Sequence, residues 1–503
     1  MDVLSQLAGG FANLMSVKNL LFCFLGVLIG QAVGVLPGIG PSAGIAILLP
    51  LTFGGDPIAS TIMFAGIYYG AQYGGTLTSV LVRIPGESST VMTSIDGYEM
   101  ARQGRAGAAL GVAAIGSVFA GLVGTIVLAF AAPALSKVAL MFGPAEYFAL
   151  VVIGLGALAL VGGALSKGLL MGAVGLALAT IGTDPQVGNP RFTFDQLWLL
   201  DGIEFLVIAV AFFGIGEVLA QAETGITGNE VEKRIGSVYP SWEELRICRW
   251  PIVRGTVIGY VIGVLPGAGA TIASFITYAV EKRVSTTPER FGKGAIEAVA
   301  APEAANNAAA TGAMVPMFAL GLPGSNTTAV MLGALIMFGL RPGPALFETN
   351  PEFVWTVIAS MFVGNVLLAI MNLPLVGLFA MLLRVPYALL YPMILALCIA
   401  GVFSQSNSES DLWLAAAFGV LGYFMRRYEY PAAPLILGLV LEPMLENALR
   451  QMMQLSHGSL MPLVERPIAL GLLLALAFAM MLPLLGKLSA GRPRTKASGD
   501  PIG

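Results

Sequence analysis

Charge is scarce in this 503-residue sequence, because Asp, Glu, Lys and Arg together make up only 11% of it. Soluble domains typically carry about a quarter charged residues, since a water-exposed surface needs them. Hydrophobic residues reach 56% and the mean hydropathy is +0.83, which also excludes a disordered chain. The sequence therefore predicts a protein that lies in the lipid bilayer.

Histidine and cysteine are almost absent, and their scarcity excludes several kinds of chemistry. His457 is the single histidine, so neither a Ser–His pair in a membrane segment nor an HExxH zinc motif is expected. Cys23, Cys248 and Cys398 are too widely spaced for a disulfide framework or a CxxC metal site. A net charge of −3 with scattered Lys and Arg gives no nucleic-acid-binding patch. We expect no enzyme activity, no cofactor, no nucleic-acid partner and no structural or catalytic transition metal.

Long apolar runs are abundant, and a helix that crosses a bilayer needs about 20 apolar residues. Two apolar regions, 19–95 and 252–345, are interrupted by Gly and Pro, which number 63 and 30 in the chain. We expect an all-α polytopic membrane protein with interrupted or re-entrant helices and roughly 10–14 membrane segments. Uninterrupted candidate segments are 107–133, 146–162, 168–183, 202–221, 353–380, 386–402, 411–424, 431–446 and 466–486.

Two motifs occur twice, in the same order, in the two interrupted regions. GVLPGIG at 34–40 recurs as GVLPGAG at 263–269, and IPGESST at 84–90 is echoed by LPGSNTT at 322–328. Aligning the second motif places Tyr68 and Tyr69 opposite Asn306 and Asn307. These matches predict an internal duplication whose two copies have partly diverged.

The distribution of Lys and Arg predicts that the two copies have opposite orientations. Cytoplasmic loops carry an excess of these residues, so the basic tail 487–496 places the C-terminus in the cytoplasm. Counting spans back from the tail puts 102–105 inside and 345–352 outside. The predicted organisation is a first membrane repeat at 1–221, a polar cytoplasmic linker at 222–251, a second, inverted repeat at 252–446, and an extra membrane helix with a basic tail at 447–503.

The Leu-Pro-Gly breaks are candidate binding sites. Proline removes a backbone donor and glycine frees φ, so helices are expected to stop at Pro37 and Pro266. Half-helices that begin after the breaks would aim unpaired, partly positive amide groups at a carboxylate, as in many secondary transporters. A proline kink with close packing of small residues is the alternative. The predicted substrate-binding residues are Gly38, Gly40 and Ser42 in the first copy and Gly267, Gly269 and Thr271 in the second.

The second motif pair supplies oxygen atoms after a Pro-Gly break. Hydroxyl, amide and freed carbonyl oxygens suit a hard cation such as Na⁺. Helix capping after a tight turn explains the same residues equally well, and Glu87 is more typical of an interface position. The predicted cation-binding residues are Ser88, Ser89, Thr90, Ser325, Asn326, Thr327 and Thr328.

The segment PEAANN at 302–307 places an acid and two amides in an alanine-rich membrane segment. Polar groups at such depth usually face a cavity or a partner helix. Hydrogen bonding between helices competes with ligand binding as the explanation. Asn306 and Asn307 are included among the predicted substrate-binding residues.

The motifs together resemble the large membrane subunit of the tripartite tricarboxylate transporter family. The resemblance implies a bacterial cytoplasmic-membrane carrier driven by a Na⁺ or H⁺ gradient. It also implies a small membrane subunit and a periplasmic solute-binding protein that delivers an organic anion, citrate or another carboxylate. The resembling stretches are GVLPGIGPSAG (34–44), YYGAQYGGTLTSVLVRIPGESS (68–89), GVLPGAGATIASFITY (263–278) and PEAANNAAATGAMVPMFALGLPGSNTT (302–328).

The expected function is therefore cation-coupled symport of an organic carboxylate by alternating access. A channel or a scaffold subunit of a membrane complex, without coupled transport, is the alternative. Saturable, gradient-dependent uptake indicates a carrier, whereas uncoupled conductance indicates a pore. The sequence leaves the particular carboxylate, the ion stoichiometry and the oligomeric state open, a homo-oligomer included.

Overall fold

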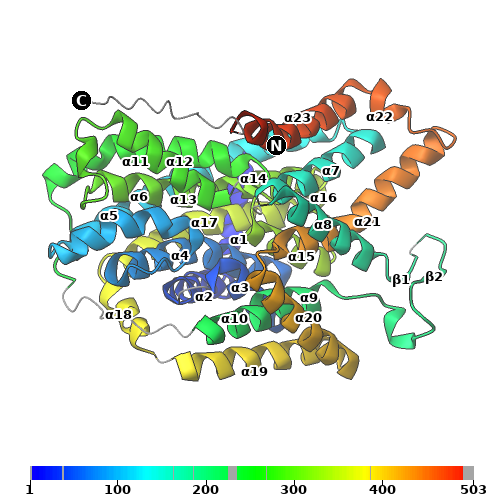
Figure 1. The fold of residues 1–503 in the computed structure, drawn as a ribbon, viewed down its shortest axis with the longest axis horizontal. Helices are drawn as coiled ribbons and strands as arrows, with labels where there is room; N and C mark the ends of the chain where they lie inside the picture. Colours follow the sequence, from blue (N-terminus) through cyan, green and yellow to red (C-terminus); the bar gives the residue numbers. More distant parts are fainter. Residues whose placement is uncertain are drawn as a thin grey trace, which may run out of the picture.

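The computed structural model describes residues 3–36, 39–161, 164–184, 186–224, 235–267, 269–385 and 387–490 (Figure 1). The helices are α1 (Val3–Leu14), α2 (Val17–Val35), α3 (Gly40–Leu48), α4 (Pro57–Val82), α5 (Val91–Arg102), α6 (Ala106–Ala139), α7 (Pro144–Val161), α8 (Leu165–Ala179), α9 (Phe205–Ala209), α10 (Gly216–Thr224), α11 (Trp242–Val264), α12 (Gly269–Val284), α13 (Glu297–Gly312), α14 (Met314–Leu320), α15 (Asn326–Met337), α16 (Leu346–Thr349), α17 (Pro351–Asn372), α18 (Val376–Ala380), α19 (Tyr387–Ser406), α20 (Glu409–Arg427), α21 (Ala432–Leu455), α22 (Pro462–Glu465) and α23 (Pro467–Ala490). Shorter elements are the 3-10 turns η1 (Leu49–Thr52), η2 (Ser88–Thr90), η3 (Leu197–Leu199), η5 (Pro288–Arg290) and η6 (Met381–Arg384), the π-helical turn η4 (Val210–Ile215), and the strands β1 (Gly182–Thr183) and β2 (Pro190–Arg191).

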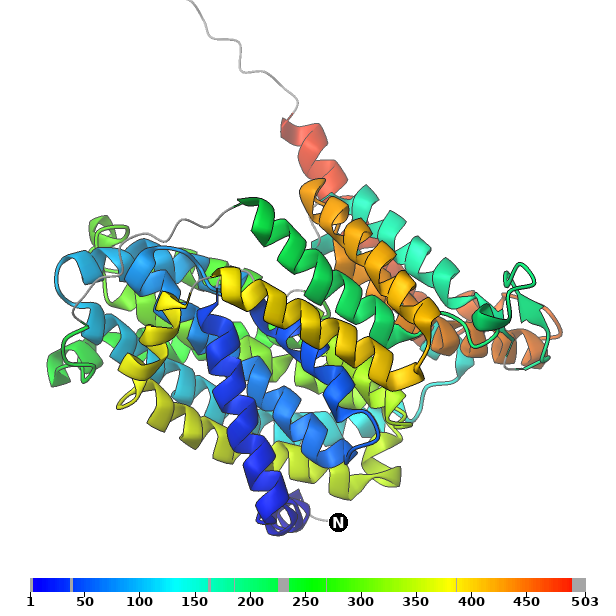
Figure 2. The ribbon, with the colours of Figure 1, turned by 90° about the horizontal axis from the view of Figure 1, so that it is seen from below.

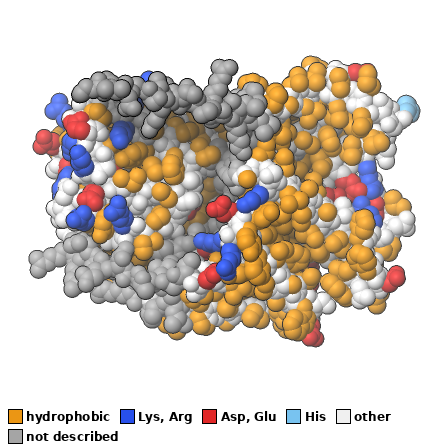
Figure 3. All heavy atoms as spheres, viewed as in Figure 1, with side chains coloured by type: hydrophobic (Ala, Val, Ile, Leu, Met, Phe, Trp, Pro, Cys, Tyr) orange, Lys and Arg blue, Asp and Glu red, His pale blue; other side chains and the backbone are white. Residues whose placement is uncertain are grey.

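The predicted all-α membrane fold is confirmed. Six helical segments in the described part of the chain are long and apolar enough to cross a bilayer: α2, α6, the continuous run from α9 through η4 to α10, α11, α17 and α21. Shorter apolar helices accompany them. Hydrophobic side chains dominate the face in Figure 3, and charged side chains gather mainly near its two ends and in a small central group. An apolar face of this extent fits contact with lipid.

Two helices stop partway, at the positions that the Leu-Pro-Gly motifs predict. α2 ends at Val35 and α3 begins at Gly40, while α11 ends at Val264 and α12 begins at Gly269. Gly40 and Gly269 have φ values of 59° and 61°, a left-handed conformation that favours glycine. The interrupted helices are thereby confirmed, although Pro37, Gly38 and Ala268 lie outside the described residues.

Each broken helix packs directly on the backbone of another helix. A Cβ atom added to Gly26, Gly30 or Gly34 of α2 would lie 2.5, 2.6 or 2.3 Å from a main-chain oxygen of α4. Glycines at every fourth position let two helix backbones meet along one face. α2 and α4 therefore form a close pair that leads into the first break.

The second broken helix repeats this packing. A Cβ atom on Gly255, Gly259 or Gly263 of α11 would lie 2.3, 2.2 or 2.3 Å from a carbonyl oxygen of α13. The same spacing thus precedes both breaks and meets equivalent partner helices. This likeness supports the duplication, while the predicted repeat boundaries and inverted orientation stay predictions.

A second group of helices lies beside the broken pairs. Figure 2 shows α10, α19 and α20 next to one another on the side seen from below. α10 and α20 approach closely: a Cβ atom added to Gly216 of α10 would lie 3.1 Å from the carbonyl oxygen of Gly419 in α20. α19 and η4, which runs directly into α10, both contact α3, so this group reaches the first half-helix.

The strands β1 and β2 form an antiparallel hairpin that projects from one end of the molecule (Figure 1). Arg450 of α21 donates two hydrogen bonds to Asp184, at 3.2 and 2.7 Å. This guanidinium holds the pKa of Asp184 well below its usual range. Arg191 of β2 also pairs with Glu446 at 2.8 Å, so ion pairs hold the hairpin against α21.

Two predicted segment limits differ from the structure. The segment predicted at 353–380 divides, because α17 ends at Asn372 just before Pro374 and α18 begins at Val376. α11 begins at Trp242, inside the range predicted as a linker, where Ser241 and Glu244 form a capping box. Linker residues 225–234 and tail residues 491–503 lie outside the described residues.

The backbone contact of α11 with α13 gives a testable prediction for Gly259→Ala. The new Cβ would lie 2.2 Å from the carbonyl oxygen of Ala305, so the helices must separate. We expect a loss of about 1–3 kcal/mol in stability, as for other overpacked sites, seen as a lower thermal unfolding midpoint in detergent.

Gly9→Ala in α1 is the matched control, because nothing lies within 4 Å of its added Cβ. Its higher helix propensity should stabilise the protein by up to about 1 kcal/mol. Equal midpoints for the two variants would contradict the close packing.

Candidate functional site

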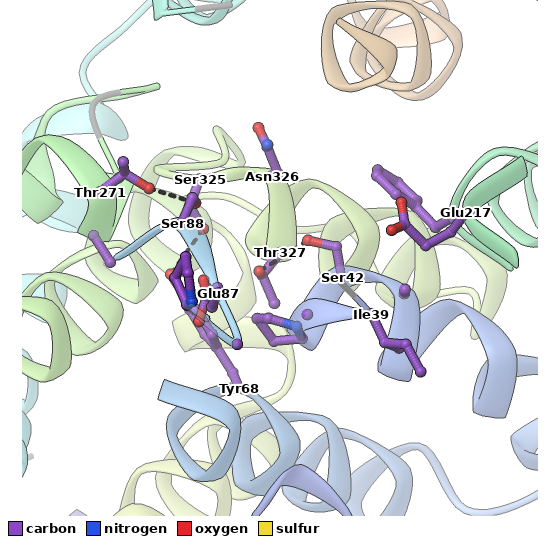
Figure 4. Close-up of a pocket in the computed structure, with 18 of the residues that line it drawn as sticks. Ile39, Ser42, Tyr68, Glu87, Ser88, Glu217, Thr271, Ser325, Asn326 and Thr327 are labelled. Carbon is purple, nitrogen blue, oxygen red and sulfur yellow. Dashed lines mark hydrogen bonds between the residues drawn. The ribbon is translucent and has the colours of Figure 1, made fainter. Parts of the chain in front are cut away.

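A cavity of about 480 Å³ lies where the two breaks and the two Pro-Gly turns meet (Figure 4). The starts of α3 and α12 line it, together with the turns that precede η2 and α15, and α10 and α20 close another side. Four segments that are far apart in the sequence therefore share one hollow. The polar side chains in the lining are Ser42, Tyr68, Glu87, Ser88, Glu217, Thr271, Ser325, Asn326, Thr327 and Arg426.

Hydroxyl groups join each broken helix to the second motif of the other half. Ser42 of α3 shares a hydrogen bond of 3.0 Å with Thr327 of α15. Thr271 of α12 shares one of 2.7 Å with Ser88 of η2. Both links run from one half of the chain to the other, so the two halves build the cavity jointly.

Ser325 fits both explanations of the second motif, helix capping and ligand binding. Its hydroxyl accepts from the backbone amide of Thr328, and the Thr328 hydroxyl accepts from the Ser325 amide, which is a capping box at the start of α15. The same Ser325 hydroxyl shares a hydrogen bond of 2.9 Å with the Tyr68 hydroxyl. Ser325 therefore begins a helix and also presents oxygen to the cavity.

Glu87 brings a carboxyl group to the cavity wall. Its Oε1 atom accepts a hydrogen bond of 3.3 Å from the Gln72 amide. Its Oε2 atom is buried and has no hydrogen-bond partner among the described residues. Gln72 is fully buried and its Oε1 atom accepts from Ser89 at 2.8 Å, which fixes its amide group. One Glu87 oxygen is thus free to interact with a ligand or a cation.

The opposite wall carries a cation. Figure 4 shows Glu217 of α10 across the cavity from Thr271 of α12. Glu217 forms an ion pair with Arg426 of α20, and Arg426 is the cationic side chain in the lining. The partly positive amide ends of α3 and α12 face the same space. The cavity therefore combines Arg426 and two helix starts with the carboxyl groups of Glu87 and Glu217.

Most of the predicted substrate-binding residues at the breaks lie in this lining. Gly40, Ser42, Gly267, Gly269 and Thr271 all line the cavity. Gly38 lies outside the described residues.

Asn306 and Asn307 do not contribute to the lining. They are buried in α13, where Asn306 donates to Glu303 and Asn307 donates to Asn306. Hydrogen bonding inside the helix bundle, the competing explanation, describes these contacts.

The predicted cation-binding residues divide in the same way. Ser88, Ser325, Asn326 and Thr327 line the cavity. Three others lie behind it: Ser89 donates to Gln72, Thr90 donates to the carbonyl of Glu87, and Thr328 caps α15. Among the residues that the structure describes, no group of three His, Cys, Asp or Glu side chains could hold a metal ion. Hydroxyl and amide oxygens are the available ligands for a hard cation.

Among the polar lining residues, sequence reasoning missed three (Tyr68, Glu217 and Arg426) and gave Glu87 too little weight. The alignment of the two motifs pairs Tyr68 with Asn306 and gives it no further role, and the sequence favours an interface position for Glu87. Glu217 stands near the end of the apolar run 202–221, which is a signal, because an acid in a membrane segment is costly. Arg426 lies just beyond the apolar segment predicted at 411–424, and no sequence pattern places it at the cavity.

Cysteine pairs can test the link between the halves. The Ser42 and Thr327 hydroxyls lie 3.0 Å apart, so we expect Ser42→Cys with Thr327→Cys to form a disulfide under mild oxidation. The three native cysteines are buried, and peptide mass spectrometry identifies the crosslinked fragment. The two single variants are the controls. Absence of the crosslink in a folded double variant would contradict the contact.

Comparisons with known proteins agree with this architecture. Residues 20–437 match the model of the tripartite tricarboxylate transporter TctA family. The chain is 46% identical over 501 residues, 99% of this chain and 100% of the relative, to an uncharacterized 52.8 kDa protein in the TAR-I ttuC' 3' region of Agrobacterium vitis. An uncharacterized protein in the TAR-II ttuC' 3' region of the same organism is 42% identical over 242 residues, 48% of this chain and 100% of that relative. No solved structure matches. The chain therefore belongs to the TctA family of tripartite tricarboxylate transporters, as its large membrane subunit.

Proposed function

We propose that the chain imports an organic carboxylate, a tricarboxylate or a related acid, by cation-coupled alternating access. The single observation that carries this proposal is the cavity lined by both broken helices and by both Pro-Gly turns. A volume of about 480 Å³ is sufficient for a small organic acid. The shared lining fits a substrate held at the junction of two repeats.

The carboxylate binds between the starts of α3 and α12. Unpaired backbone amides at a helix start attract anions, since the donors and the helix dipole both favour negative charge. Ser42 and Thr271 add hydroxyl donors beside these starts. Arg426 supplies the full positive charge, because a guanidinium can exchange its bond to Glu217 for one to the substrate.

The coupling cation, Na⁺ or H⁺, binds at the same junction. Ser88, Ser325, Asn326 and Thr327 offer neutral oxygens, and Glu87 offers a buried carboxylate oxygen that has no partner among the described residues. Neutral oxygens with one carboxylate suit a hard monovalent cation. Ion and substrate then favour the same state, which couples their binding by about 1–3 kcal/mol.

The way the cavity is assembled supports the proposal of alternating access. One side of the cavity comes from the starts of α3 and α12 and the turns before η2 and α15, while α10 and α20 form the facing wall. Movement of one group past the other would expose the bound ligand to either side. The cytoplasmic C-terminus and the inverted repeat remain part of this proposal.

The partners proposed are those of a tripartite system: a small membrane subunit and a periplasmic solute-binding protein in a bacterial cytoplasmic membrane. The family to which the chain belongs is named for such a three-part transporter. The binding protein would deliver the carboxylate to the external side of the cavity. A homo-oligomer of the chain is compatible with this assembly.

Uptake into proteoliposomes that contain the partner subunits tests the proposal. Citrate and a panel of di- and tricarboxylates are offered with and without a Na⁺ or pH gradient. We expect saturable uptake that rises with a gradient. Conductance without coupling, or no flux of any carboxylate, would instead favour a channel or a scaffold subunit.

Substitutions at the breaks should abolish uptake without preventing membrane insertion. Gly267 has a φ of 84°, so Gly267→Val forces a β-branched side chain into a left-handed conformation. Ser42→Leu removes the hydroxyl at the start of α3 and fills the cavity. Membrane fractionation and labelled-carboxylate uptake measure the two properties separately. Normal uptake by both variants would remove the half-helix site.

Arg426→Gln should weaken carboxylate binding, because a charge-assisted hydrogen bond is lost. We expect the apparent Kd or KM to rise about tenfold or more. Arg427→Gln is the matched control, since Arg427 pairs with Glu223 and does not line the cavity.

Glu217→Gln should have the opposite effect to Arg426→Gln. It frees Arg426 from its ion pair, so the affinity for the carboxylate should be unchanged or higher. A fall in affinity equal to that of Arg426→Gln would show that the intact ion pair, and not the arginine, supports binding.

A further inference from the structure

Glu303 is an acid in the interior of the molecule that the proposed site does not use. It lies on α13, has 0% of its side chain exposed, and does not line the cavity. α13 is buried along its whole length and contacts α4, α5 and α6. A carboxyl group at such a position is costly when charged, so it requires a physical explanation.

Three donors surround this carboxyl group. The Thr76 hydroxyl donates to Oε2 at 2.6 Å, the Thr93 hydroxyl donates to Oε1 at 2.5 Å, and the Asn306 amide donates to Oε2 at 3.3 Å. Hydroxyl–oxygen distances of about 2.5–2.7 Å are typical of a charged acceptor. The donors come from α4, α5 and α13, so three helices converge on one side chain.

Among the described residues, no Lys or Arg side chain forms an ion pair with the Glu303 carboxyl group. Two titratable side chains interact with it electrostatically, Tyr73 of α4 and Glu87 of the cavity wall, and neither carries positive charge. Three hydroxyl and amide donors compensate a buried carboxylate only partly.

Two other acids on the neighbouring helices, Asp96 and Glu281, have partners of their own. Asp96 of α5 is held by the Tyr278 hydroxyl and by the amides of the loop before α13. Glu281 of α12 forms an ion pair with Arg254.

Neutral groups and one further acid complete the surroundings of Glu303. α6 contributes Ser117, which donates to the Glu303 carbonyl, and α11 faces α13 with glycines. Glu297 is the other acid of α13, almost two turns before Glu303.

A short polar path connects Glu303 with the cavity. Glu87 in the wall accepts from the Gln72 side chain, and Gln72 lies one helical turn before Thr76 on α4. The Thr76 hydroxyl is 3.5 Å from the Gln72 carbonyl and donates to Glu303. Glu303 and Glu87 also interact electrostatically, so a change of charge at Glu303 acts on the wall of the cavity.

We propose that Glu303 takes up and releases the coupling proton of the transport cycle. The inference rests on the proposed carboxylate transport and refines it: where the coupling ion is a proton, it binds at Glu303 behind the cavity, and the oxygens at the junction are left to Na⁺. A proton from water on one side binds a Glu303 oxygen and forms an O–H bond; after the conformational change that bond breaks and the proton returns to water on the other side. The Thr76 or Thr93 hydroxyl then turns to accept from the protonated carboxyl group.

The geometry favours a proton over a metal cation at this position. A metal cation needs several oxygens arranged around it with room for the ion. Here the two threonine hydroxyls already lie within 2.6 Å of the carboxyl oxygens. A proton needs no such space, and it removes the buried charge as the negatively charged substrate arrives.

Infrared spectroscopy of the full-length protein tests the proton without any substrate. On lowering the pH, the wild type should gain a band of a protonated carboxyl group that is missing from Glu303→Gln and retained by Glu297→Gln. Glu297 is the matched control because it is a buried acid of the same helix. A band that persists in Glu303→Gln, or that disappears only in Glu297→Gln, would overturn the proposal.

Transport in the assembled complex provides the second readout. With citrate as the probe, Glu303→Gln should lower accumulation driven by a pH gradient about tenfold or more, the size of a lost coupling. Citrate exchange at equal pH on both sides should be retained, since exchange needs no net proton movement. Loss of Na⁺ dependence with retained pH dependence would overturn the assignment.

The two proposals fail in different ways. If no carboxylate crosses with the wild type, the proposed function fails, while the infrared band still decides whether Glu303 titrates. If the wild type is coupled and Glu303→Gln is equally coupled to the pH gradient, only the Glu303 inference is overturned.

Discussion

The rest of the structure depends on how backbone polar groups are satisfied where two helices stop inside the protein. In lipid such groups find no water, so a break is stable only against other protein or a wet cavity. The starts of α3 and α12 meet this condition by facing one cavity. The hydroxyl links Ser42–Thr327 and Thr271–Ser88 hold each break against the opposite half. The cavity that makes the two helix breaks stable is therefore also the cavity that can bind a ligand.

Local sequence predicted much of this arrangement. Apolar runs located the long helices, and Leu-Pro-Gly located both breaks, because proline and glycine act on their immediate neighbours. The local sequence did not distinguish the role of Ser88 from that of Ser89, although Ser88 faces the cavity and Ser89 donates a hydrogen bond to Gln72. Which neighbour faces inward depends on the course of the turn, which the motif does not specify.

Sequence patterns do not predict which segments far apart in the chain come into contact. Glu217 and Arg426 come from helices far apart in the chain, and only the packing of α10 on α20 brings them together at the cavity. Likewise, Asn306 aligns with Tyr68, yet Tyr68 lines the cavity while Asn306 binds Glu303. Equivalent positions in the two copies thus have different surroundings, and alignment alone does not reveal them.

The crossed hydroxyl links have a consequence for the ancestry of such a molecule. A chain with only one half would have half of each link, and pairing two identical halves would place Ser42 beside the segment of Ser88 and never beside Thr327. The carboxyl group at Glu87 would also appear twice, where the joined molecule has Ser325 at the equivalent place. With the predicted duplication, joining the two copies in one chain permits an asymmetric binding chamber that a symmetric dimer of either half could not form.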